Sequence, residues 1–461
     1  MQEFDLVVIG SGPGGQRAAV QAAKLGKRAA VIEKREIVGG VTAHTGTIPS
    51  KTLREAVLFL SGWRQRGFYG QSYRVKSDIK MADLMHRLQA TVSRQIEIIR
   101  HQLLRNGVTV INGEASFVDR QRLRILALDG KETIVRGEHI VVATGTVPHR
   151  PDDIPFDDER IIDSDGILGL SEIPRSMTVI GAGVIGVEYA TIFSALDTRI
   201  TLVDGREQML DFIDRDVIDE FRHQLQSRDI LLRLGEQLAS VERDTDGSVI
   251  TRLASGKRLR SDTLMVAAGR VGATAGLALD QAGLEADERG RLRVNEHYQT
   301  SVPNIYAVGD VIGFPALAST SAEQGRLAAC HAFGADCTSS PEYFPFGIYA
   351  VPEISMVGKT EQELQAAGIP YDSGIAHLRE TARGQIQGNQ EGLLKLVFGL
   401  EDRRLLGVHI IGEGATELIH IGQAVMAHGG QLDYLVEAVF NYPTLAEAYK
   451  IAALAAWNRI R

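Results

Sequence analysis

A glycine-rich turn at residues 10–15 joins an apolar run, residues 4–9, to an alanine-rich amphipathic stretch, and a second apolar run then ends in Glu33. A strand, a G-x-G-x-x-G turn, a helix and a second strand with a terminal acid form the βαβ unit that binds dinucleotides. The glycines allow the tight turn, the approach of a pyrophosphate to the helix N-terminus and close packing of helix on strand, while the acid accepts hydrogen bonds from the ribose. The predicted contacts of this first unit are Gly10, Gly12, Gly14, Gly15 and Glu33.

The same pattern returns later in the chain. Gly181 follows Gly10 by 171 positions, and Asp204 follows Glu33 by the same 171. The equal offset of the first glycine and of the terminal acid indicates that one unit was built twice. Two dinucleotide sites in one chain predict two redox cofactors in contact; the alternative is that one copy is vestigial, although both keep their glycines and their acid. The predicted contacts of the second unit are Gly181, Gly183, Gly186, Asp204 and Arg206.

Length and composition predict a globular chain with about three domains, because it has 461 residues, 44% of them hydrophobic and 23% charged. The net charge of −8 comes from interspersed residues, without a basic block that would attract nucleic acid or an anionic membrane. No apolar run approaches the roughly 20 residues of a membrane-spanning helix. The first strand begins at Phe4, which leaves no room for a leader peptide. We therefore expect a cytoplasmic protein that binds neither nucleic acid nor membranes.

Two other features are expected to be structural. Cys330 and Cys337 are the only cysteines, and their spacing fits no CxxC or zinc motif, so we expect two incidental thiols near a helix end. Residues 53–106 have apolar positions at intervals of three and four, which predicts a helical insertion within the first dinucleotide unit.

Two more segments, residues 140–145 and 304–310, read as strands that end in a tight turn and in Asp310. Together with the glycine turns, they resemble the flavoprotein pyridine-nucleotide oxidoreductases, the family of lipoamide dehydrogenase and glutathione reductase, and the resemblance runs from end to end. It implies an α/β chain with two Rossmann-like domains, for FAD and for NAD(P), and a C-terminal α+β interface domain that forms a homodimer or a larger homo-oligomer. The implied boundaries are 1–150 and 270–340 for FAD, 151–269 for NAD(P) and 341–461 for the interface domain.

The resemblance also implies further FAD contacts. The counterpart of Asp310 binds the ribityl chain, and residues 143–145 and 268–270 mark the two crossovers between domains. The helix that begins near residues 319–321 is expected to aim its N-terminus at the flavin pyrimidine. The cofactor contacts added in this way are Thr42, Thr47, Lys51, Thr144, Gly145, Gly269, Arg270, Asp310 and Ala318.

Redox-disulfide members of this family carry two cysteines just before an Ile-Pro-Ser-Lys, which here is residues 48–51. The cysteine positions fall on Thr42 and Thr47. A threonine hydroxyl can neither form a disulfide nor act as a thiolate near neutral pH, so dithiol chemistry is not expected. His44 either fills this region as a polar residue or lines the pocket of the missing disulfide.

The C-terminal domain shows a second departure. Disulfide reductases of the family supply a His-Pro-Thr and a following Glu to the partner subunit; here Tyr442 stands in the His position while Glu447 remains. The base is therefore absent together with the thiols that it would serve. We expect neither lipoamide dehydrogenase nor glutathione reductase activity.

Residues 46–51 and 440–444 are similar to the soluble, FAD-containing, Si-specific transhydrogenases of the family, which often keep the first cysteine where this chain has Thr42. The resemblance implies that NADPH gives hydride to FAD and NAD⁺ then takes it from the same site, in a ping-pong exchange. Lys51 is the implied cation near flavin N5, paired with Glu188, and the alternative is a surface lysine that caps a turn.

Use of both nucleotides is predicted at one strand end. An acid there binds the ribose of NAD, and a nearby arginine pairs with the 2′-phosphate of NADP. Asp204 and Arg206 stand two residues apart. The alternative is that Arg206 only faces solvent.

Two other functions remain open from the sequence. Reduced flavin can pass electrons to quinones or oxygen, which would make the chain an NAD(P)H:quinone or oxygen reductase. A silent FAD-holding scaffold is the third hypothesis, and the intact Lys51, Glu188 and both glycine turns argue against it.

Overall fold

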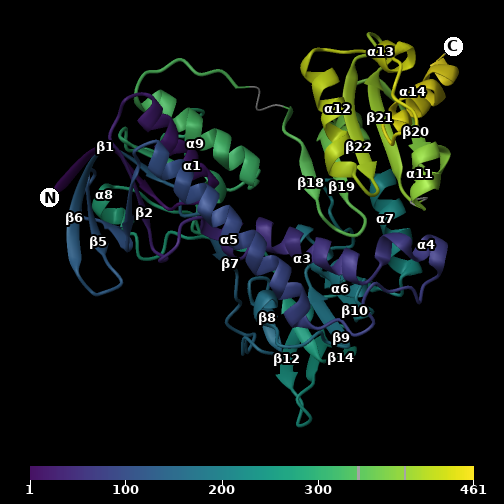
Figure 1. Cartoon of the computed structure of the whole chain (residues 1–461), viewed down its shortest axis with the longest axis horizontal. Helices are drawn as coiled ribbons and strands as arrows, with labels where there is room; N and C mark the ends of the chain where they lie inside the picture. The colour runs from purple at the N-terminus through teal and green to yellow at the C-terminus, as the bar shows by residue number, and fades with distance from the viewer. Residues whose placement is uncertain (340–342, 389–390, 461) are drawn as a thin grey trace. The chain divides into compact units, whose positions relative to one another are not determined.

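The computed structural model describes residues 1–339, 343–388 and 391–460. These residues form two compact units, each built from segments far apart in the sequence, as the mixed colours of Figure 1 show. Unit 1 consists of Met1–Leu53, Met85–His149 and Gly269–Ser339. Unit 2 consists of Arg54–Leu84, Arg150–Ala268 and Ser340–Arg461.

Unit 1 is built on one sheet in the order β3-β2-β1-β6-β5-β4, with β17 paired to the end of β6. The strands β1, β2, β3, β6 and β17 are parallel, whereas β4 and β5 are antiparallel. Their bounds are β1 (Gln2–Ile9), β2 (Ala29–Glu33), β3 (Thr109–Asn112), β4 (Glu114–Phe117), β5 (Arg122–Leu126), β6 (Glu132–Val142) and β17 (Ile305–Ala307).

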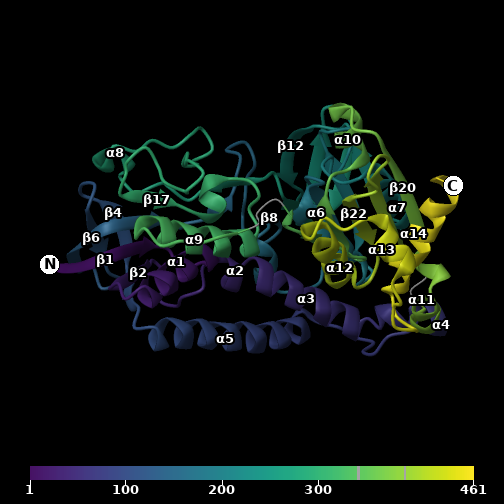
Figure 2. The same cartoon turned by 90° about the horizontal axis from the view of Figure 1, so that it is seen from above.

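Strand β1 is buried on both faces, as parallel strands covered on two sides usually are. Leu6 and Val8 pack into a core with α1 (Pro13–Lys24) and α9 (Ala318–Ala332), while Val7 and Ile9 pack into a second core with β4 and β5. The helices α1 and α9 lie side by side along the sheet (Figures 1 and 2). This packing fixes the turn after β1 at the carboxyl edge of the sheet.

Unit 2 contains a parallel sheet in the order β11-β10-β9-β15-β8 and a separate antiparallel sheet, β12-β13-β14. The parallel strands and their helices are β8 (Ile161–Asp163), β9 (Ser176–Ile180), α6 (Val184–Ser194), β10 (Arg199–Asp204), α7 (Arg215–Ser227), β11 (Leu231–Leu234) and β15 (Thr263–Val266). The antiparallel strands are β12 (Leu238–Arg243), β13 (Val249–Leu253) and β14 (Arg258–Ser261).

The C-terminal part of unit 2 is an antiparallel sheet in the order β18-β19-β22-β21-β20, packed against helices. Its strands are β18 (Phe346–Ile348), β19 (Ile354–Gly358), β20 (Tyr371–His377), β21 (Leu393–Gly399) and β22 (Leu405–Ile411). Its helices are α10 (Glu361–Ala367), η5 (Leu378–Glu380), α11 (Ala382–Gln387), α12 (Ala415–Ala427), α13 (Leu432–Glu437) and α14 (Glu447–Ile460). Among the residues that the structure describes, no helix is both long and apolar enough to cross a membrane.

The expected insertion at 53–106 is helical only in part, because residues 70–80 contain turns and bends but no helix. The other elements are α2 (Gly40–His44), α3 (Thr47–Leu60), η1 (Trp63–Gln65), α4 (Arg66–Tyr69), α5 (Met81–Arg105), β7 (Thr146–Pro148), η2 (Gly166–Gly169), β16 (Arg270–Gly272), α8 (Leu279–Ala282) and η3 (Gly309–Ile312).

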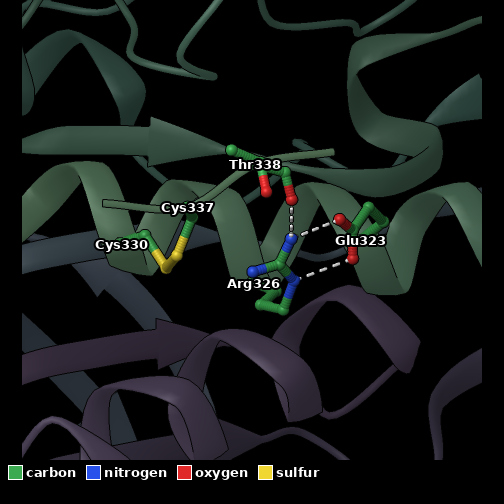
Figure 3. Close-up of a disulfide and its surroundings, with 5 residues drawn as sticks. All are labelled: Glu323, Arg326, Cys330, Cys337 and Thr338. Atoms are coloured by element: carbon green, nitrogen blue, oxygen red, sulfur yellow. Dashed lines mark hydrogen bonds and ion pairs between the residues drawn. A yellow bond between two sulfur atoms is a disulfide. The ribbon is translucent and has the colours of Figure 1, made fainter. Parts of the chain in front are cut away.

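The expectation of two incidental thiols is wrong, because Cys330 and Cys337 form a disulfide. Cys330 lies in the last turn of α9, and the chain folds back there, with the Ala335 N–H donating to the Cys330 carbonyl at 2.9 Å. Figure 3 shows a second tie beside the disulfide: Arg326 binds Glu323 and also donates to the Thr338 carbonyl at 3.0 Å. The chain reverses direction at the end of α9 and thereby brings together two cysteines whose spacing matches no motif.

Candidate dinucleotide sites

The two glycine turns have the same backbone geometry. Gly10 and Gly181 adopt φ angles of 103° and 104°, a conformation that favours glycine. A Cβ at either position would also collide with the carbonyl oxygen that follows the neighbouring strand. Gly15 and Gly186 lie so close to the carbonyls of Gly10 and Gly181 that a side chain has no room. The tight turns and the close packing of helix on strand therefore depend on these four glycines.

Gly12 and Gly183 border open space at two helix N-termini. The helix α1 begins directly after Gly12, and α6 begins directly after Gly183. Neither N-cap residue supplies a side-chain hydrogen bond, and a Cβ at either glycine would meet no protein atom within 4 Å. The first N–H groups of both helices are thus left for an anion, which is how such units hold a pyrophosphate. Both turns fit a dinucleotide.

Glu33 ends β2 beside the first turn and is 4% exposed. Its Oε2 accepts a hydrogen bond from the Ser11 N–H at 3.0 Å and another from the Ser11 hydroxyl, while its Oε1 accepts from the Arg35 N–H at 3.0 Å. The Ser11 hydroxyl in turn accepts from the Gly39 N–H at 2.8 Å. The acid is therefore fixed to the turn that it serves. Ser11 was missed by sequence reasoning because it occupies the variable position between two motif glycines.

Asp204 repeats this arrangement in the second unit. Its Oδ2 accepts from the Ala182 N–H at 2.7 Å, and its Oδ1 accepts from the Arg206 N–H at 2.8 Å. The Arg206 guanidinium adds two hydrogen bonds to the same carboxylate, Nε to Oδ1 at 3.0 Å and Nη2 to Oδ2 at 2.9 Å. Burial opposes ionisation of Asp204, but the hydrogen bonds from Arg206 and Ala182 outweigh it and hold the pKa of Asp204 below its usual value.

The two crossover segments pair with each other within unit 1, as the antiparallel strands β7 and β16. Gly145 and Gly269, next to these strands, have φ angles of 69° and 97°, and the Gly269 carbonyl accepts from the His149 N–H at 3.0 Å. Thr144 precedes them, and its buried Oγ1 has no hydrogen-bond partner among the described residues. A buried hydroxyl in that condition is suited to a ligand.

Arg270 and Asp310 meet through Thr146. The Arg270 Nε donates to the Thr146 hydroxyl at 2.8 Å, and this hydroxyl lies 3.5 Å from Asp310 Oδ2. Burial raises the pKa of Asp310, and the positive charge of Arg270 offsets this only in part. A half-buried carboxylate of this kind is suited to hydroxyl donors.

Ala318 is the first residue of α9, whose N-cap also lacks a side-chain hydrogen bond. Close to this end, the Gly309 N–H donates to Gln324 Oε1 at 2.8 Å, and a Cβ at Gly14 would lie 3.0 Å from the Ser321 carbonyl oxygen. Gly14 therefore serves the packing of α1 on α9, whereas Gly12 borders the open side.

The two threonines that the resemblance places at the cysteine positions lie on the helices α2 and α3. Thr42 is within α2, Thr47 is the first residue of α3, and Lys51 follows one turn later on α3. His44 Nε2 lies 3.2 Å from each of two loop carbonyls, at residues 37 and 38. His44 thus holds a loop, as expected of a polar filler.

In unit 2, Glu188 lies on α6 and is 4% exposed. Its Oε1 accepts a hydrogen bond from the backbone N–H of Tyr349 at 2.8 Å. Sequence reasoning missed this contact because its partner is a backbone group 161 residues away. Among the described residues, no group of three or more His, Cys, Asp or Glu side chains is arranged to hold a metal ion.

Comparison with known families gives two matches that together span nearly the whole chain. Residues 4–325 match the family described as "Pyridine nucleotide-disulphide oxidoreductase", and residues 344–453 match its dimerisation domain. The chain belongs to the pyridine nucleotide-disulphide oxidoreductase family. The resemblance inferred from the glycine turns and strand ends is therefore confirmed, and so is the α/β fold class.

Curated members of this family are similar to the chain over its full length. A protein of Mycobacterium bovis named "Soluble pyridine nucleotide transhydrogenase" is 53% identical over 100% of this chain and 98% of its own. One of the same name from Colwellia psychrerythraea is 45% identical over 99% of each chain.

Solved structures of the family agree in fold. LpdA from Mycobacterium tuberculosis superposes with a TM-score of 0.90 at 25% identity, over 98% of this chain and 99% of that one. The HOCl-induced flavoprotein disulfide reductase RclA from Escherichia coli gives a TM-score of 0.87 at 26% identity, again over 98% and 99%.

This chain departs from the disulfide reductases of its family at the C-terminal end too. Tyr442 is 69% exposed on the loop before α14, and the neighbouring Thr444 hydroxyl donates to the Asn441 carbonyl at 2.7 Å. Glu447 is the first residue of α14, and its buried Oε2 has no hydrogen-bond partner in the part of the chain that the structure describes. The resemblance places this phenol at the position of an imidazole base.

Proposed function

We propose that the chain is an FAD-containing, Si-specific transhydrogenase that exchanges hydride between NADPH and NAD⁺. The observation that carries the proposal is the pair of intact dinucleotide units, each with an acid bonded to its own glycine turn. The resemblance, which implies threonines at both positions of the redox dithiol, agrees with it. Whole-chain identity of 53% and 45% to proteins named soluble pyridine nucleotide transhydrogenase supports it. Two other activities, quinone or oxygen reduction, use the same bound flavin and are outcomes of the test below.

The proposed cofactor sites follow the two units. FAD is held by Gly10, Gly12, Gly14, Gly15, Glu33, Thr42, Thr47, Lys51, Thr144, Gly145, Gly269, Arg270, Asp310 and Ala318. NAD(H) and NADP(H) are held by Gly181, Gly183, Gly186, Asp204 and Arg206. The proposed domains are FAD-binding at 1–150 and 270–340, NAD(P)-binding at 151–269 and interface at 341–461.

The exchange is ping-pong, because both nucleotides use the second unit and must therefore enter it in turn. Bound FAD supplies the group that accepts hydride from one nicotinamide and returns it to the other. The chain orients the nicotinamide by holding its ribose and pyrophosphate at the turn after β9. Lys51 would supply positive charge at the reacting atoms, Glu188 would be a second charged residue of the exchange, and the N-terminus of α9 would favour the negative charge that builds on the flavin.

The assembly that we propose is a homodimer or a larger homo-oligomer in the cytoplasm. The matched dimerisation domain supports it, and two residues between α13 and α14 leave large side chains exposed, Val439 at 94% and Tyr442 at 69%. Such exposed apolar residues favour an interface.

An anaerobic experiment tests the proposed function. The FAD-loaded protein is mixed with NADPH and an NAD⁺ analogue whose reduced form absorbs at its own wavelength. Rapid reduction of the analogue supports transhydrogenation. Flavin reduction without transfer indicates a quinone or oxygen reductase, and absence of flavin reduction indicates a silent scaffold.

A further inference from the structure

Residues 349–351, which connect β18 to β19 in unit 2, bond through their backbone to side chains from other elements. Ala350 is fully buried and Val351 is 2% exposed. A buried backbone group without a partner costs free energy, so the residues that satisfy this segment also fix its position.

The helix α6 accepts hydrogen bonds from two of the three N–H groups of the segment. The Tyr349 N–H donates to Glu188 Oε1 at 2.8 Å, and the Val351 N–H donates to Thr191 Oγ1 at 3.0 Å. Glu188 and Thr191 are three residues apart and hence on one face of α6. The Thr191 hydroxyl lies 2.9 Å from the Val187 carbonyl oxygen, to which it donates, so its lone pairs are directed to Val351.

Two arginines donate hydrogen bonds to two of the three carbonyl groups of the segment. Arg54 Nε, on α3, donates to the Ala350 carbonyl at 3.0 Å, and Arg228, just after α7, donates to the Val351 carbonyl. Arg54 is 2% exposed, and the Arg228 side chain is 13% exposed with its guanidinium 4.7 Å from the centre of the Trp63 ring. Neither arginine is free to move far from its carbonyl.

We propose that Thr191 is a positioning residue for hydride exchange. It holds Val351, and so keeps the Tyr349 N–H, two residues earlier, in register with the Glu188 carboxylate. The orientation of Glu188 then depends on a hydroxyl one helical turn away. This inference rests on the proposed function of Glu188, and it predicts the same dependence for NADH and NADPH because it acts away from the ribose site at Asp204.

The test compares Thr191→Val with Thr191→Ser in the FAD-loaded, full-length protein. Valine keeps the shape but leaves the Val351 N–H without its acceptor, whereas serine keeps the hydroxyl. Anaerobic stopped-flow mixing with NADH and with NADPH gives the rate constant of flavin reduction and the dissociation constant of each nucleotide. We expect Thr191→Val to lower the rate constant roughly tenfold with both nucleotides, with dissociation constants changed less than about twofold, since loss of one buried hydrogen bond corresponds to about that factor. Thr191→Ser should restore the wild-type rate constant.

Three outcomes would overturn the inference: a wild-type rate constant in Thr191→Val, an equal loss in Thr191→Ser, or a loss confined to one nucleotide. Should Thr191→Val lose its FAD or fail to fold, Arg228→Met carries the test, because it removes the donor to the Val351 carbonyl and keeps an apolar stem over Trp63. The same equal loss is expected from it, and a wild-type rate constant would contradict the inference. Failure of the proposed function is recognised separately in the wild-type protein, which would then show either no flavin reduction or flavin reduction without transfer to the NAD⁺ analogue.

Discussion

The Arg206 guanidinium lies on the carboxylate of Asp204, with Nε 3.0 Å from Oδ1 and Nη2 2.9 Å from Oδ2. The Arg206 side chain is 50% exposed and that of Asp204 is 8% exposed. The two residues proposed to bind the phosphate and the ribose are thus each other's hydrogen-bond partners. A ribose hydroxyl must compete with Arg206 for the carboxylate, and a 2′-phosphate must draw Arg206 away from it.

Arg206→Ala is expected to weaken NADPH and to leave NADH nearly unchanged. An arginine–phosphate pair is charge-assisted, and loss of such a pair corresponds to roughly 10- to 150-fold in affinity. We expect the lower end, about tenfold, because NADPH must also break the pair with Asp204. Steady-state kinetics of flavin reduction with each nucleotide at fixed salt measure it. Equal losses for both nucleotides would show that Arg206 only supports the loop.

Asp204→Ala is expected to have the opposite effect to Arg206→Ala, weakening NADH binding more than NADPH binding. It removes the acceptor for the ribose hydroxyls, and it also removes a negative charge next to the 2′-phosphate. The KM for NADH should therefore rise more than that for NADPH in the same assay. Asp211, which lies 3.7 Å from Arg206, offers a control. Asp211→Asn should change the KM for NADH and the KM for NADPH by no more than about twofold, as for exposed ion pairs in general. A larger rise for NADPH in Asp204→Ala would contradict this assignment.

Gly12→Val and Gly183→Val form a matched pair that separates the two sites. Gly12 has a φ angle of −67° and Gly183 one of −80°, which any residue adopts, and neither Cβ would meet a protein atom within 4 Å. Both variants should therefore fold. We expect Gly12→Val to lose FAD, measured by absorbance per chain, and Gly183→Val to stay yellow while flavin reduction by NADPH falls at least tenfold, since a side chain there occupies the approach of the pyrophosphate. The reverse pattern would show that the two nucleotides are exchanged between the units.

Local signals in the sequence predicted the first unit well. The apolar run 4–9 lies within strand β1 (Gln2–Ile9), and the amphipathic stretch 16–25 largely coincides with α1 (Pro13–Lys24). Period and glycine spacing suffice there because a parallel strand and its helix are specified by neighbouring residues. The equal 171-residue offset extends to contacts that were not predicted, since Ser11 and Ala182 each bond the terminal acid of their own unit.

Long-range partners explain what the sequence did not reveal. Residues 54–84 belong to unit 2, where Arg54 lies 3.3 Å from Glu353 and Arg64 lies 2.6 Å from Glu413. These partners are about 300 residues away, and no periodicity marks them. For Arg206 the sequence left phosphate binding or solvent exposure open, and its pairing with Asp204 is a third arrangement that depends on side-chain rotamers.

The disulfide should support stability and not the exchange reaction. Cys330→Ser opens a short loop, and closing a loop of this length contributes roughly 2–3 kcal/mol to stability in the chain-entropy description. We expect a lower urea midpoint for this variant and for wild-type protein with a dithiol reductant, with unchanged transhydrogenation and no reduction of lipoamide or glutathione disulfide. Cys337→Ser is the control and should give the same midpoint. Loss of transhydrogenation in either serine variant would contradict this expectation.

Asp310→Asn should make the FAD-free protein more stable and FAD binding weaker. Burial raises the pKa of Asp310 above its value in the unfolded chain, so folding disfavours the ionised form. The stability that Asp310 contributes is fully present below its pKa in the unfolded chain, and it is lost as the pH rises through its pKa in the folded protein. A neutral amide avoids that loss at pH 7 to 8. The amide also loses a charged acceptor for hydroxyl donors, which corresponds to about tenfold or more in FAD affinity.

Asp287→Asn is the matched control for this prediction. Backbone N–H groups, that of Arg291 first, lower the pKa of Asp287, so loss of its carboxylate should destabilise the FAD-free protein and leave FAD affinity unchanged. Thermal unfolding of both apoproteins at pH 8 measures the change in stability, and fluorescence titration with FAD measures the change in affinity. An Asp310→Asn apoprotein that is less stable than the wild type would show that the partners of Asp310 stabilise its ionised form more than burial destabilises it.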